Sequence, residues 1–452
     1  MGTPSLNTAL LRSSAHLAKA LGAASFALLG ASACSSAPPA NGVPVATASA
    51  SASASASEKA PKIEPKAEVH WKQRATPGQI PSVGHIATNA AGDVIFATET
   101  AEGAYLFRLD ATSHLTWRTV LAGDRTVTGG VAIDSEGNAY VAGWFQTALA
   151  LGGKLVSTGE SSAFLIKLGT DGKKIWGNAL RGDNASVPVL TLNAKGDLFL
   201  AGGHGGDMRV GAVSLRNERG EQPVGEGSLF VAQMTGSGSA KWARDVGAIG
   251  VAAEVALDGA GEMFVSGRHM TPGAPSFGPV RADRPHPSGV EHFLIKLDAS
   301  GKPRWTRHID ASRMVAIPGG SGDVYACTGP FADGPSTLLR IAGDGRVVFK
   351  MPLPDLDKLM SCDDVAVDDE GRAYVVGMFY AGERDPMTGG EGVSPQVLKV
   401  DGTGNVVSTL RLHAGFTINA APRLVWSKGR LLAAGVSGTY AEPSFFLAEL
   451  TL

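Results

Sequence analysis

The sequence predicts an all-β fold, and three observations lead to this class. Gly accounts for 59 of the 452 residues, and helix-favouring residues are not concentrated anywhere beyond the N-terminal region. Apolar and polar residues alternate in short runs, which is the period of a strand with one buried face. The same strand–turn–strand pattern returns many times from residue 68 onward. Repetition of this kind predicts one architecture for the whole stretch.

The first half of the repeat is a hairpin such as VAIDSEGNAYVAG at 131–143. Its turn carries a glycine, which adopts positive φ without a Cβ clash. Three residues later a large residue such as Tyr140 recurs, and two further on a small residue or Val faces the same side. Large and small residues at fixed offsets allow one twisted sheet to pack on the next. The counterparts, seven copies in all, are 86–98, 190–202, 255–267, 315–328, 365–377 and 423–435.

The second half of the repeat is another strand pair, such as FLIKLGTDGKKIWGNAL at 164–180. Its outer strand carries a tryptophan in the column Trp117, Trp176, Trp242 and Trp305, which changes to Phe349 and Ser408. The counterparts are 106–121, 230–246, 293–309, 338–353 and 396–412, and the last begins at 445–452. Each full repeat is therefore predicted to be a four-stranded antiparallel sheet.

Seven such sheets around an axis make a seven-bladed β-propeller. The period-2 pattern excludes a helical solenoid, and an open array of hairpins would leave strand edges exposed. A sandwich would not need seven copies of one pattern.

The segment EVHWKQRAT at 68–76 is expected to complete the last blade. It reads as a strand with Val69, Trp71 and Gln73 on one face, and it has no neighbour in its own part of the sequence. The last repeat lacks a tryptophan-bearing outer strand, and Trp71 fits that column. The sequence therefore predicts that 68–76 pairs with 446–452 and closes the ring.

The stretches DSEGNAYVAG and DDEGRAYVVG resemble the bacterial seven-bladed β-propeller repeat and, more distantly, the NHL repeat. LDASGKPRW is similar to the repeats of pyrroloquinoline-quinone-type propellers. The resemblance covers 68–452 and implies that the first strand of each blade is innermost and the fourth is outermost. It is specific for fold and weak for function, because such propellers carry many unrelated activities.

Residues 1–33 are predicted to be an export signal. Arg12 and Lys19 precede an apolar stretch at 20–31, and small residues come just before Cys34. This resembles a bacterial lipoprotein signal, in which Cys34 becomes the lipidated first residue. An ordinary secretory signal cleaved near the same residues is the alternative, and either would export the protein. No Asp of an inner-membrane retention signal follows Cys34, so a lipid anchor in the outer membrane, periplasmic or surface-facing, is expected.

Residues 34–67 are predicted to be the lipidated cysteine and a disordered tether, and 68–452 the propeller. Alternating Ala and Ser followed by Pro, Lys and Glu cannot bury enough apolar surface to fold. Charged residues make up 18% of the whole chain, and the formal net charge is −2. This balance argues against nucleic-acid binding. The body has no helix-like apolar stretch of about 18 residues or more, so no internal membrane span is expected.

Long connections between second and third strands are the first candidate for a binding surface. They are expected at 146–162, 203–228, 268–291 and 378–394, with neutral insertion as the alternative. Their histidines, which lack metal-ligand spacing and are expected in solvent, are His204, His269, His286 and His292. No catalytic motif is present, and neither a metal site nor a cofactor is predicted.

Polar residues near the starts of inner strands are the second candidate. His85, Glu254, Arg313, Asp363 and Asp364 are expected to ring the mouth of the central channel. They mark a place where a ligand could bind, and they do not by themselves define a reaction.

Cys327 and Cys362 are a candidate disulfide, because an exported protein folds in an oxidising compartment. Cys327 ends the second strand of one predicted blade and Cys362 begins the first strand of the next, so both lie on the same face. Alternatively, Cys327 only fills the column of small residues.

The favoured function is the binding of a protein or glycan partner through the long-loop face by a monomeric, surface-tethered propeller. The alternatives are an enzyme with a site at the channel mouth (lyase, hydrolase or quinoprotein dehydrogenase) and a rigid scaffold within an envelope complex. The quinoprotein version is disfavoured by the seven predicted blades and the lack of a ligand set.

Overall fold

The computed structural model describes residues 64–452 apart from short gaps. The gaps are 76–81, 101–102, 124, 152–153, 183–184, 217–226, 270–275, 278–279, 282–290, 310, 319–321, 330–334, 354–360, 385–390, 413–420 and 439–441. Cys34 and His286 lie outside the described residues.

The described part of the chain is all-β, and neighbouring strands pair antiparallel. The first repeat is β2 (Ser82–Thr88), β3 (Val94–Thr100), β4 (Gly103–Leu109) and β5 (Leu115–Gly123). The second repeat is β6 (Val127–Ile133), β7 (Ala139–Ala150), β8 (Lys154–Leu168) and β9 (Lys174–Gly182). Next are β10 (Val189–Leu192), β11 (Leu198–His204), β14 (Ser228–Met234) and β15 (Ala240–Leu257), with β12 (Met208–Val210) and β13 (Val213–Leu215) inserted after β11. The long β15 belongs to two repeats, because it pairs with β14 through its first half and with β16 through its second half. The repeat that it begins continues with β16 (Met263–His269), β19 (Glu291–Leu297) and β20 (Pro303–Arg307), and β17 (Ser276–Phe277) and β18 (Val280–Arg281) are inserted after β16.

Three further sheets complete this part of the chain. The first is β21 (Ala311–Ala316), β22 (Val324–Thr328), β23 (Thr337–Ile341) and β24 (Val347–Pro352). The second is β25 (Asp364–Val367), β26 (Ala373–Arg384), β27 (Glu391–Val400) and β28 (Val406–Arg411). The third is β29 (Arg423–Ser427), β30 (Arg430–Gly438), β31 (Pro443–Thr451) and β1 (Lys66–Arg74).

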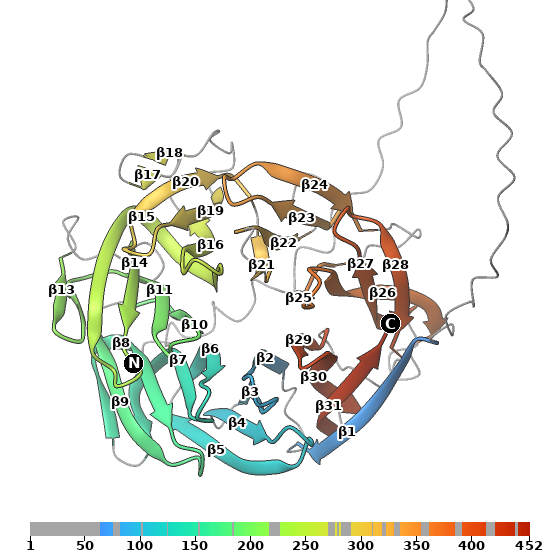
Figure 1. Ribbon diagram of the computed structural model, residues 1–452. Coiled ribbons are helices and arrows are strands. Elements are labelled where there is room, and N and C mark those ends of the chain that lie inside the picture. The colour runs from blue at the N-terminus through green and yellow to red at the C-terminus, as the bar shows by residue number, and fades with distance from the viewer. Residues whose placement is uncertain are drawn as a thin grey trace, which may run out of the picture. The chain divides into compact units, whose positions relative to one another are not determined.

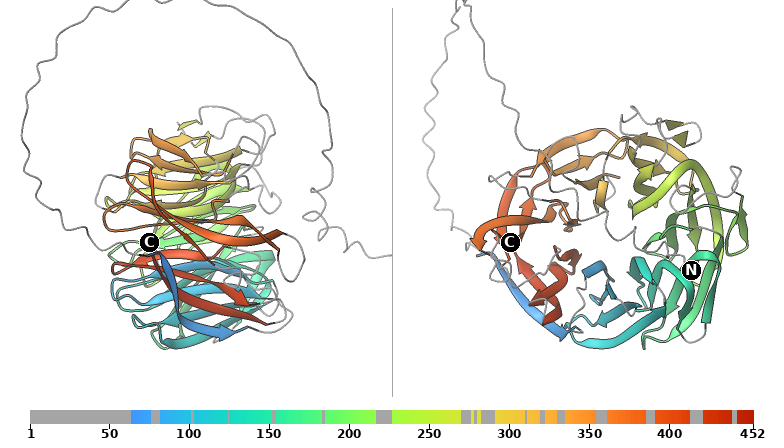
Figure 2. Two further views of the ribbon diagram at one scale, coloured as in Figure 1. Left: turned by 90° about the vertical axis from the view of Figure 1, so that its right-hand side faces the viewer. Right: turned by 180° about the vertical axis from the view of Figure 1, so that it is seen from behind.

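The inner strands contact one another in a cycle. Contacts run from β2 to β6, β10, β15, β21, β25 and β29, and β29 contacts β2 again. Figure 1 shows β2, β6, β10, β21, β25 and β29 nearest the middle, with β1, β5, β24 and β28 on the outside. Strand β15 runs along the outside first, because its N-terminal half pairs with β14 as an outer strand. The two views in Figure 2 show the sheets stacked face to face around the same opening. This order agrees with the expectation that the first strand of each repeat is innermost.

The strand nearest the N-terminus pairs with the strand nearest the C-terminus. Strand β1 runs antiparallel to β31, with Lys72 opposite Phe446, as the sequence predicted for this segment. The strand spans 66–74, two residues earlier than expected. One detail of the prediction is wrong: Val69 is 45% exposed and does not share the buried face of Trp71. The cause is a register shift between these two residues, which interrupts the alternation of side chains.

Trp71 joins the last sheet to the first. Its indole ring lies 5.7 Å from the ring of Phe96 on β3 and 5.4 Å from that of Phe107 on β4. Phe107 also contacts Phe445 of β31, with ring centroids 5.2 Å apart. An apolar core therefore lies between the β29–β30–β31–β1 sheet and the β2–β3–β4–β5 sheet.

The outer-strand aromatic residues pack on turn glycines of the following sheet. A Cβ added to any of these glycines would lie 3.3 Å or less from the aromatic ring. The pairs are Trp117 with Gly172, Trp176 with Gly238, Trp242 with Gly301, Trp305 with Gly345, and Phe349 with Gly404. The recurring tryptophans of the outer strands therefore pack each sheet against the next one.

Gly301→Ala is expected to destabilise the protein more than Gly261→Ala. Both glycines have nearly the same positive φ, +79° and +78°. A Cβ at Gly301 would lie 2.6 Å from the Trp242 ring, whereas nothing lies within 4 Å of one at Gly261. Backbone strain alone should cost about 1 kcal/mol at either site, and the clash should add about 1–2 kcal/mol at Gly301 only. Denaturant unfolding of the two variants measures this difference, and equal losses would contradict the contact.

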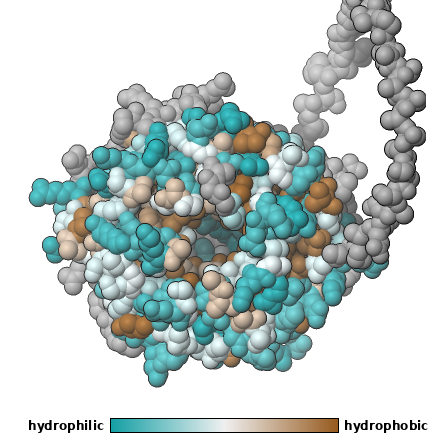
Figure 3. All heavy atoms as spheres, in the orientation of Figure 1, coloured by the Kyte–Doolittle hydropathy of each residue, from teal (hydrophilic) through white to brown (hydrophobic). Residues whose placement is uncertain are grey.

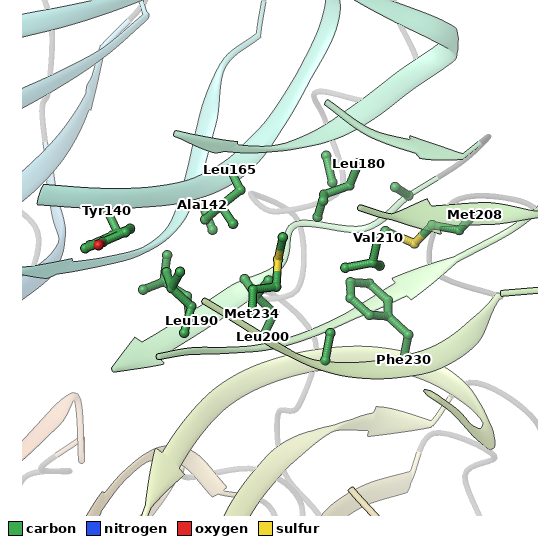
Figure 4. Packing of buried hydrophobic residues seen from close by; sticks show 14 of the residues in the cluster. Tyr140, Ala142, Leu165, Leu180, Leu190, Leu200, Met208, Val210, Phe230 and Met234 are labelled. Atoms are coloured by element: carbon green, nitrogen blue, oxygen red, sulfur yellow. The ribbon is translucent and has the colours of Figure 1, made fainter. Parts of the chain in front are cut away.

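The connections predicted as long loops are largely strand extensions. At 146–162 the β7–β8 hairpin continues, with Leu149 opposite Leu155. At 203–228 the β12–β13 hairpin adds to the edge of β9, with Met208 opposite Gly182. Figure 4 shows Met208 and Val210 beside Leu180 and Phe230 in the shared core. The inserted residues at 203–216 therefore cover a neighbouring sheet.

Candidate functional site

A cavity of about 610 Å³ lies among the inner strands. Segments of β2, β6, β10, β15, β21, β25 and β29 line it. Figure 3 shows the corresponding hollow at the centre of one face of the molecule. Four of the five residues predicted at the channel mouth line this cavity, namely His85, Glu254, Arg313 and Asp364. Asp363 precedes β25, and its backbone carbonyl accepts hydrogen bonds at the same place.

The cavity residues share one layer because of strand register. In each inner hairpin the residue of this layer lies opposite the small residue, or Val, that the repeat places in the second strand. The pairs are His85 with Ala97, Gly130 with Ala142, Val189 with Ala201, Glu254 with Ser266, Arg313 with Cys327, Asp364 with Val376, and Arg423 with Ala434. The layer is polar on five strands and apolar on β6 and β10, and on β10 it is Leu190, next to Val189, that lines the cavity.

Register shifts recur immediately before this layer. They precede His85, Gly130, Glu254 and Arg313 in their respective strands. A bulge inserts an extra residue and re-aims the side chain that follows it. Repeated bulges at one level therefore turn the side chains of His85, Glu254 and Arg313 relative to the regular alternation.

An ion pair crosses the cavity layer. Nη1 of Arg313 donates to Oε2 of Glu254 at 3.0 Å, and Nε of Arg313 donates to the carbonyl oxygen of Asp363 at 3.4 Å. Both charged side chains are about one-fifth exposed. Burial alone would lower the pKa of Arg313, but the carboxylates of Glu254 and Asp364 outweigh it and raise that pKa. Burial raises the pKa of Glu254, and the guanidinium of Arg313 only partly offsets this.

Arg423 is a polar member of the layer that the sequence did not single out. Its Nη1 donates to the carbonyl oxygen of Asp363 at 2.6 Å, and its Nε to that of Val83 at 3.2 Å. The adjacent Leu424 N–H donates to Oδ2 of Asp364 at 2.8 Å. These bonds tie β29 to β25 and to β2. Burial, followed by the charge of Arg313, lowers the pKa of Arg423.

His85 is held neutral at the same level. Its Nε2 lies 3.2 Å from the carbonyl oxygen of Thr128 on β6. Burial, then the positive charges of Arg313 and Arg423, lower the pKa of His85 to about 3. Next to it, Glu99 accepts hydrogen bonds from the backbone N–H and the hydroxyl of Thr128 at 2.9 and 3.2 Å. Burial raises the pKa of Glu99 despite these bonds.

His85→Gln is expected to make the protein less sensitive to acid. The unfolded chain, with an imidazole pKa of about 6.5, takes up the proton before the folded protein does, so wild-type stability falls as pH drops through about 6.5 toward 3. Allowing for partial exposure, the effect should be about 2 kcal/mol between pH 7 and 4. Urea unfolding at several pH values tests this against the exposed-histidine control His114→Gln. Parallel pH profiles for wild type and His85→Gln would contradict it.

Cys327 and Cys362 form a disulfide, with Cα atoms 5.4 Å apart. The bond links β22 to the residues that lead into β25, directly before Asp363 and Asp364. The hydroxyl of Ser312, on β21, lies 3.2 Å from the carbonyl oxygen of Cys327. The disulfide therefore borders the polar side of the cavity.

The histidines of the inserted connections do not gather into a site among the described residues. His204 was expected in solvent, and this is wrong: it is fully buried at the end of β11, with Nδ1 2.7 Å from the carbonyl oxygen of Gly206 and Nε2 3.5 Å from Oδ2 of Asp245. His292 is half-buried on β19. In the described part of the chain no three His, Cys, Asp or Glu residues could hold a metal ion together.

Comparison with known proteins bears on the fold. Residues 117–144, from Trp117 of β5 to Trp144 of β7, match the SBBP family model, the beta-propeller repeat. The chain contains a β-propeller repeat. A solved structure described as "Structure of U3-55K" is similar to this propeller chain over 83% of its length and 98% of that chain, with a TM-score of 0.46 and 8% identity. No curated protein matches the sequence. Among the described residues there is no helix that could span a membrane.

Proposed function

We propose that residues 66–451 form a closed seven-bladed β-propeller that acts as a binding scaffold for a protein or glycan partner. The cycle of contacts among the inner strands supports the seven-bladed ring. The pairing of β1 with β31 supports its closure by the two ends of the folded region.

The polar layer of the central cavity is the observation that carries the binding function. Inner strands from five sheets bring an imidazole, two guanidinium groups and two carboxylates to one level. Binding sites are concave and combine apolar walls with a few placed polar groups. Here β6 and β10 supply the apolar wall through Gly129, Gly130 and Leu190. The partner would engage this mouth and the inserted connections around it.

The anchoring of the scaffold is part of the proposal. Lipidation of Cys34 would tether the propeller to the cell envelope, at the outer membrane, through residues 34–63. Radiolabelled palmitate should be incorporated into the wild-type protein and not into Cys34→Ser, and only the wild type should sediment with membranes. Labelling or sedimentation of both forms alike would contradict the anchor.

The binding proposal is tested by capture with a matched pair of variants. Intact protein is immobilised and exposed to solubilised envelope proteins and, separately, to a glycan array. Wild type and Glu449→Gln should capture the same partner, whereas Glu254→Gln should capture less of it. Glu449 is a suitable control because it also faces an arginine, Arg430 at 3.5 Å, away from the cavity. Failure to capture any partner, or equal capture by Glu254→Gln, would contradict the proposal.

Acid–base catalysis at the cavity is the second candidate. Glu254, whose pKa is raised by burial, is the kind of group that exchanges protons with a substrate, and the neutral His85 beside the cavity could offer a hydrogen bond. A turnover of any screened glycoside or ester that disappears in Glu254→Gln and persists in Glu449→Gln would favour this candidate over binding alone.

A further inference from the structure

Arg423 differs from most of the other buried or half-buried arginines in the described part of the chain. Arg307, on β20, also bonds to carbonyl oxygens, those of Gly345 and Thr306, but it does not line the cavity. Arg108, Arg313 and Arg340 each pair with a carboxylate, at 2.8 Å with Asp93, 3.0 Å with Glu254 and 2.8 Å with Asp323. Within the described residues, no carboxylate lies within ion-pair distance of Arg423. Its recorded hydrogen bonds go only to the carbonyl oxygens of Asp363 and Val83.

The Nη2 group of Arg423 is left for a ligand. Nε and Nη1 are used by the two carbonyl oxygens, and the residue lines the cavity. The two bonds also orient the planar guanidinium, which is the group best matched to a carboxylate. A cation removed from water without an acid partner is costly, and a bound anion would offset that cost. Burial is the largest cause of the lowered pKa of Arg423, and the nearby carboxylates only partly offset it.

The groups around Arg423 carry charges of both signs: the charge of Arg313 lowers its pKa, whereas the carboxylates of Asp364, Glu254 and Asp363 act in the opposite direction. The positive charge of Arg313 lowers the pKa of both Arg423 and His85, although Arg313 is paired with Glu254. The nearest carboxylate, Asp364, is engaged through Oδ2 by the N–H of Leu424 at 2.8 Å. A ligand carboxylate would therefore meet a guanidinium with donor capacity left over.

The walls favour a peptide over a sugar. Sugar rings commonly stack on open aromatic faces, and Trp426 is the only Trp, Tyr or Phe among the described lining residues. Its ring is already stacked on Tyr374, 5.4 Å away, and its Nε1 donates to Asp369. The wall opposite the charged groups is formed by Gly129, Gly130 and Leu190, which suits the aliphatic part of a side chain.

We infer that the part of the partner entering the cavity is an acidic peptide segment, one of whose carboxylates pairs with Nη2 of Arg423. The inference rests on the binding function proposed above and names the chemistry of its partner. Recognition of acidic segments by arginine is a recurring mode of peptide binding.

The test is a calorimetric titration of the intact protein with three probes. They are an acetylated, amidated peptide of two adjacent glutamates flanked by glycines, the same peptide with glutamines, and an oligogalacturonate. The glutamate peptide should bind, and the glutamine peptide should bind at least about tenfold more weakly, as expected for loss of a charge-assisted hydrogen bond. Binding of the glutamate peptide should weaken with added salt.

Variants assign the binding to Arg423. Arg423→Gln should weaken binding of the glutamate peptide by about tenfold or more, and Arg423→Lys should weaken it less because the charge remains. Arg430→Gln, which alters an arginine of the same hairpin that already faces Glu449, should bind as the wild type does. Thermal unfolding of each variant shows that it is folded, and Arg423→Lys keeps the test valid if Arg423→Gln is not.

Several outcomes would overturn the inference. Equal affinity for the glutamate and glutamine peptides, or undiminished binding by a folded Arg423 variant, would remove Arg423 from recognition. Arg423-dependent binding of oligogalacturonate without peptide binding would assign the cavity to an acidic glycan. If no probe binds while Glu254-dependent capture of a partner persists, the acidic-peptide inference fails and the proposed function stands. If capture fails as well, both are wrong.

Discussion

Trp71→Ala is expected to lower the free energy of unfolding by about 3 kcal/mol, in the range for truncating a large aromatic residue in a core. The indole contacts Phe96 and Phe107 of the first sheet from the strand that completes the last. Removing it leaves a cavity where the two ends of the folded region meet. Guanidinium unfolding followed by circular dichroism measures the loss.

Val69→Ala is the matched control for Trp71→Ala. Val69 lies on the same strand, but the register shift leaves it 45% exposed. Exposed substitutions away from special features usually change stability by about 0.5 kcal/mol or less. If Trp71→Ala cost no more than Val69→Ala, β1 would not secure the junction with β3 and β4.

Reduction of the Cys327–Cys362 disulfide is expected to lower the free energy of unfolding by about 4 kcal/mol, the chain-entropy value for a loop of this size. The two cysteines are 35 residues apart in sequence. The bond also joins neighbouring sheets beside Asp363, whose carbonyl oxygen holds both Arg313 and Arg423. Unfolding of the wild type with and without reductant measures the loss.

The double variant Cys327→Ala/Cys362→Ala controls for other effects of reductant. It should unfold at the same denaturant concentration under both conditions. Mass spectrometry after alkylation of the unreduced, denatured wild type should find neither thiol labelled. Two labelled thiols would show that the disulfide is not formed. A wild type whose unfolding does not change with reductant would show that the disulfide does not stabilise the protein.

The hairpins of the repeat could be predicted because a single residue type is required at their turns. The turn glycines all adopt positive φ, as expected. They are Gly92, Gly137, Gly196, Gly261, Gly322, Gly371 and Gly429. The pairing of β1 with β31 was also predictable, because an unpartnered strand and a sheet lacking its outer strand occurred together.

The inserted connections could not be predicted as well. Polar and small residues such as those at 156–162 read as loop, yet the backbone there continues the β7–β8 hairpin. Strand extension depends on a neighbouring strand, and local composition does not reveal it. His204 shows the same effect, because Phe230 of the neighbouring β14 packs against its ring and covers it.

The candidate cavity was only partly predictable. Counting back seven residues from the turn glycine reaches His85, Glu254 and Asp364, so their common level is visible in the sequence. The same count from Gly429 reaches Pro422, because Arg423 lies 11 residues before its partner Ala434, whereas His85 lies 12 residues before Ala97. Arg423 was therefore missed, although it opens the quoted repeat at 423–435. Its lack of an acid partner emerges only from three-dimensional contacts.

The pairing of β1 with β31 has a consequence for how the protein folds. Arg74 donates a hydrogen bond to Glu442, which lies 368 positions further along the chain. Strand β1 therefore cannot pair until β31 has been synthesised. Closing such a loop from an unstructured chain would cost on the order of 5 kcal/mol in entropy. Formation of the intervening sheets, each stacked on its predecessor, brings the two ends together beforehand and removes most of that cost. We therefore expect this junction to form last during folding and to open first under stress.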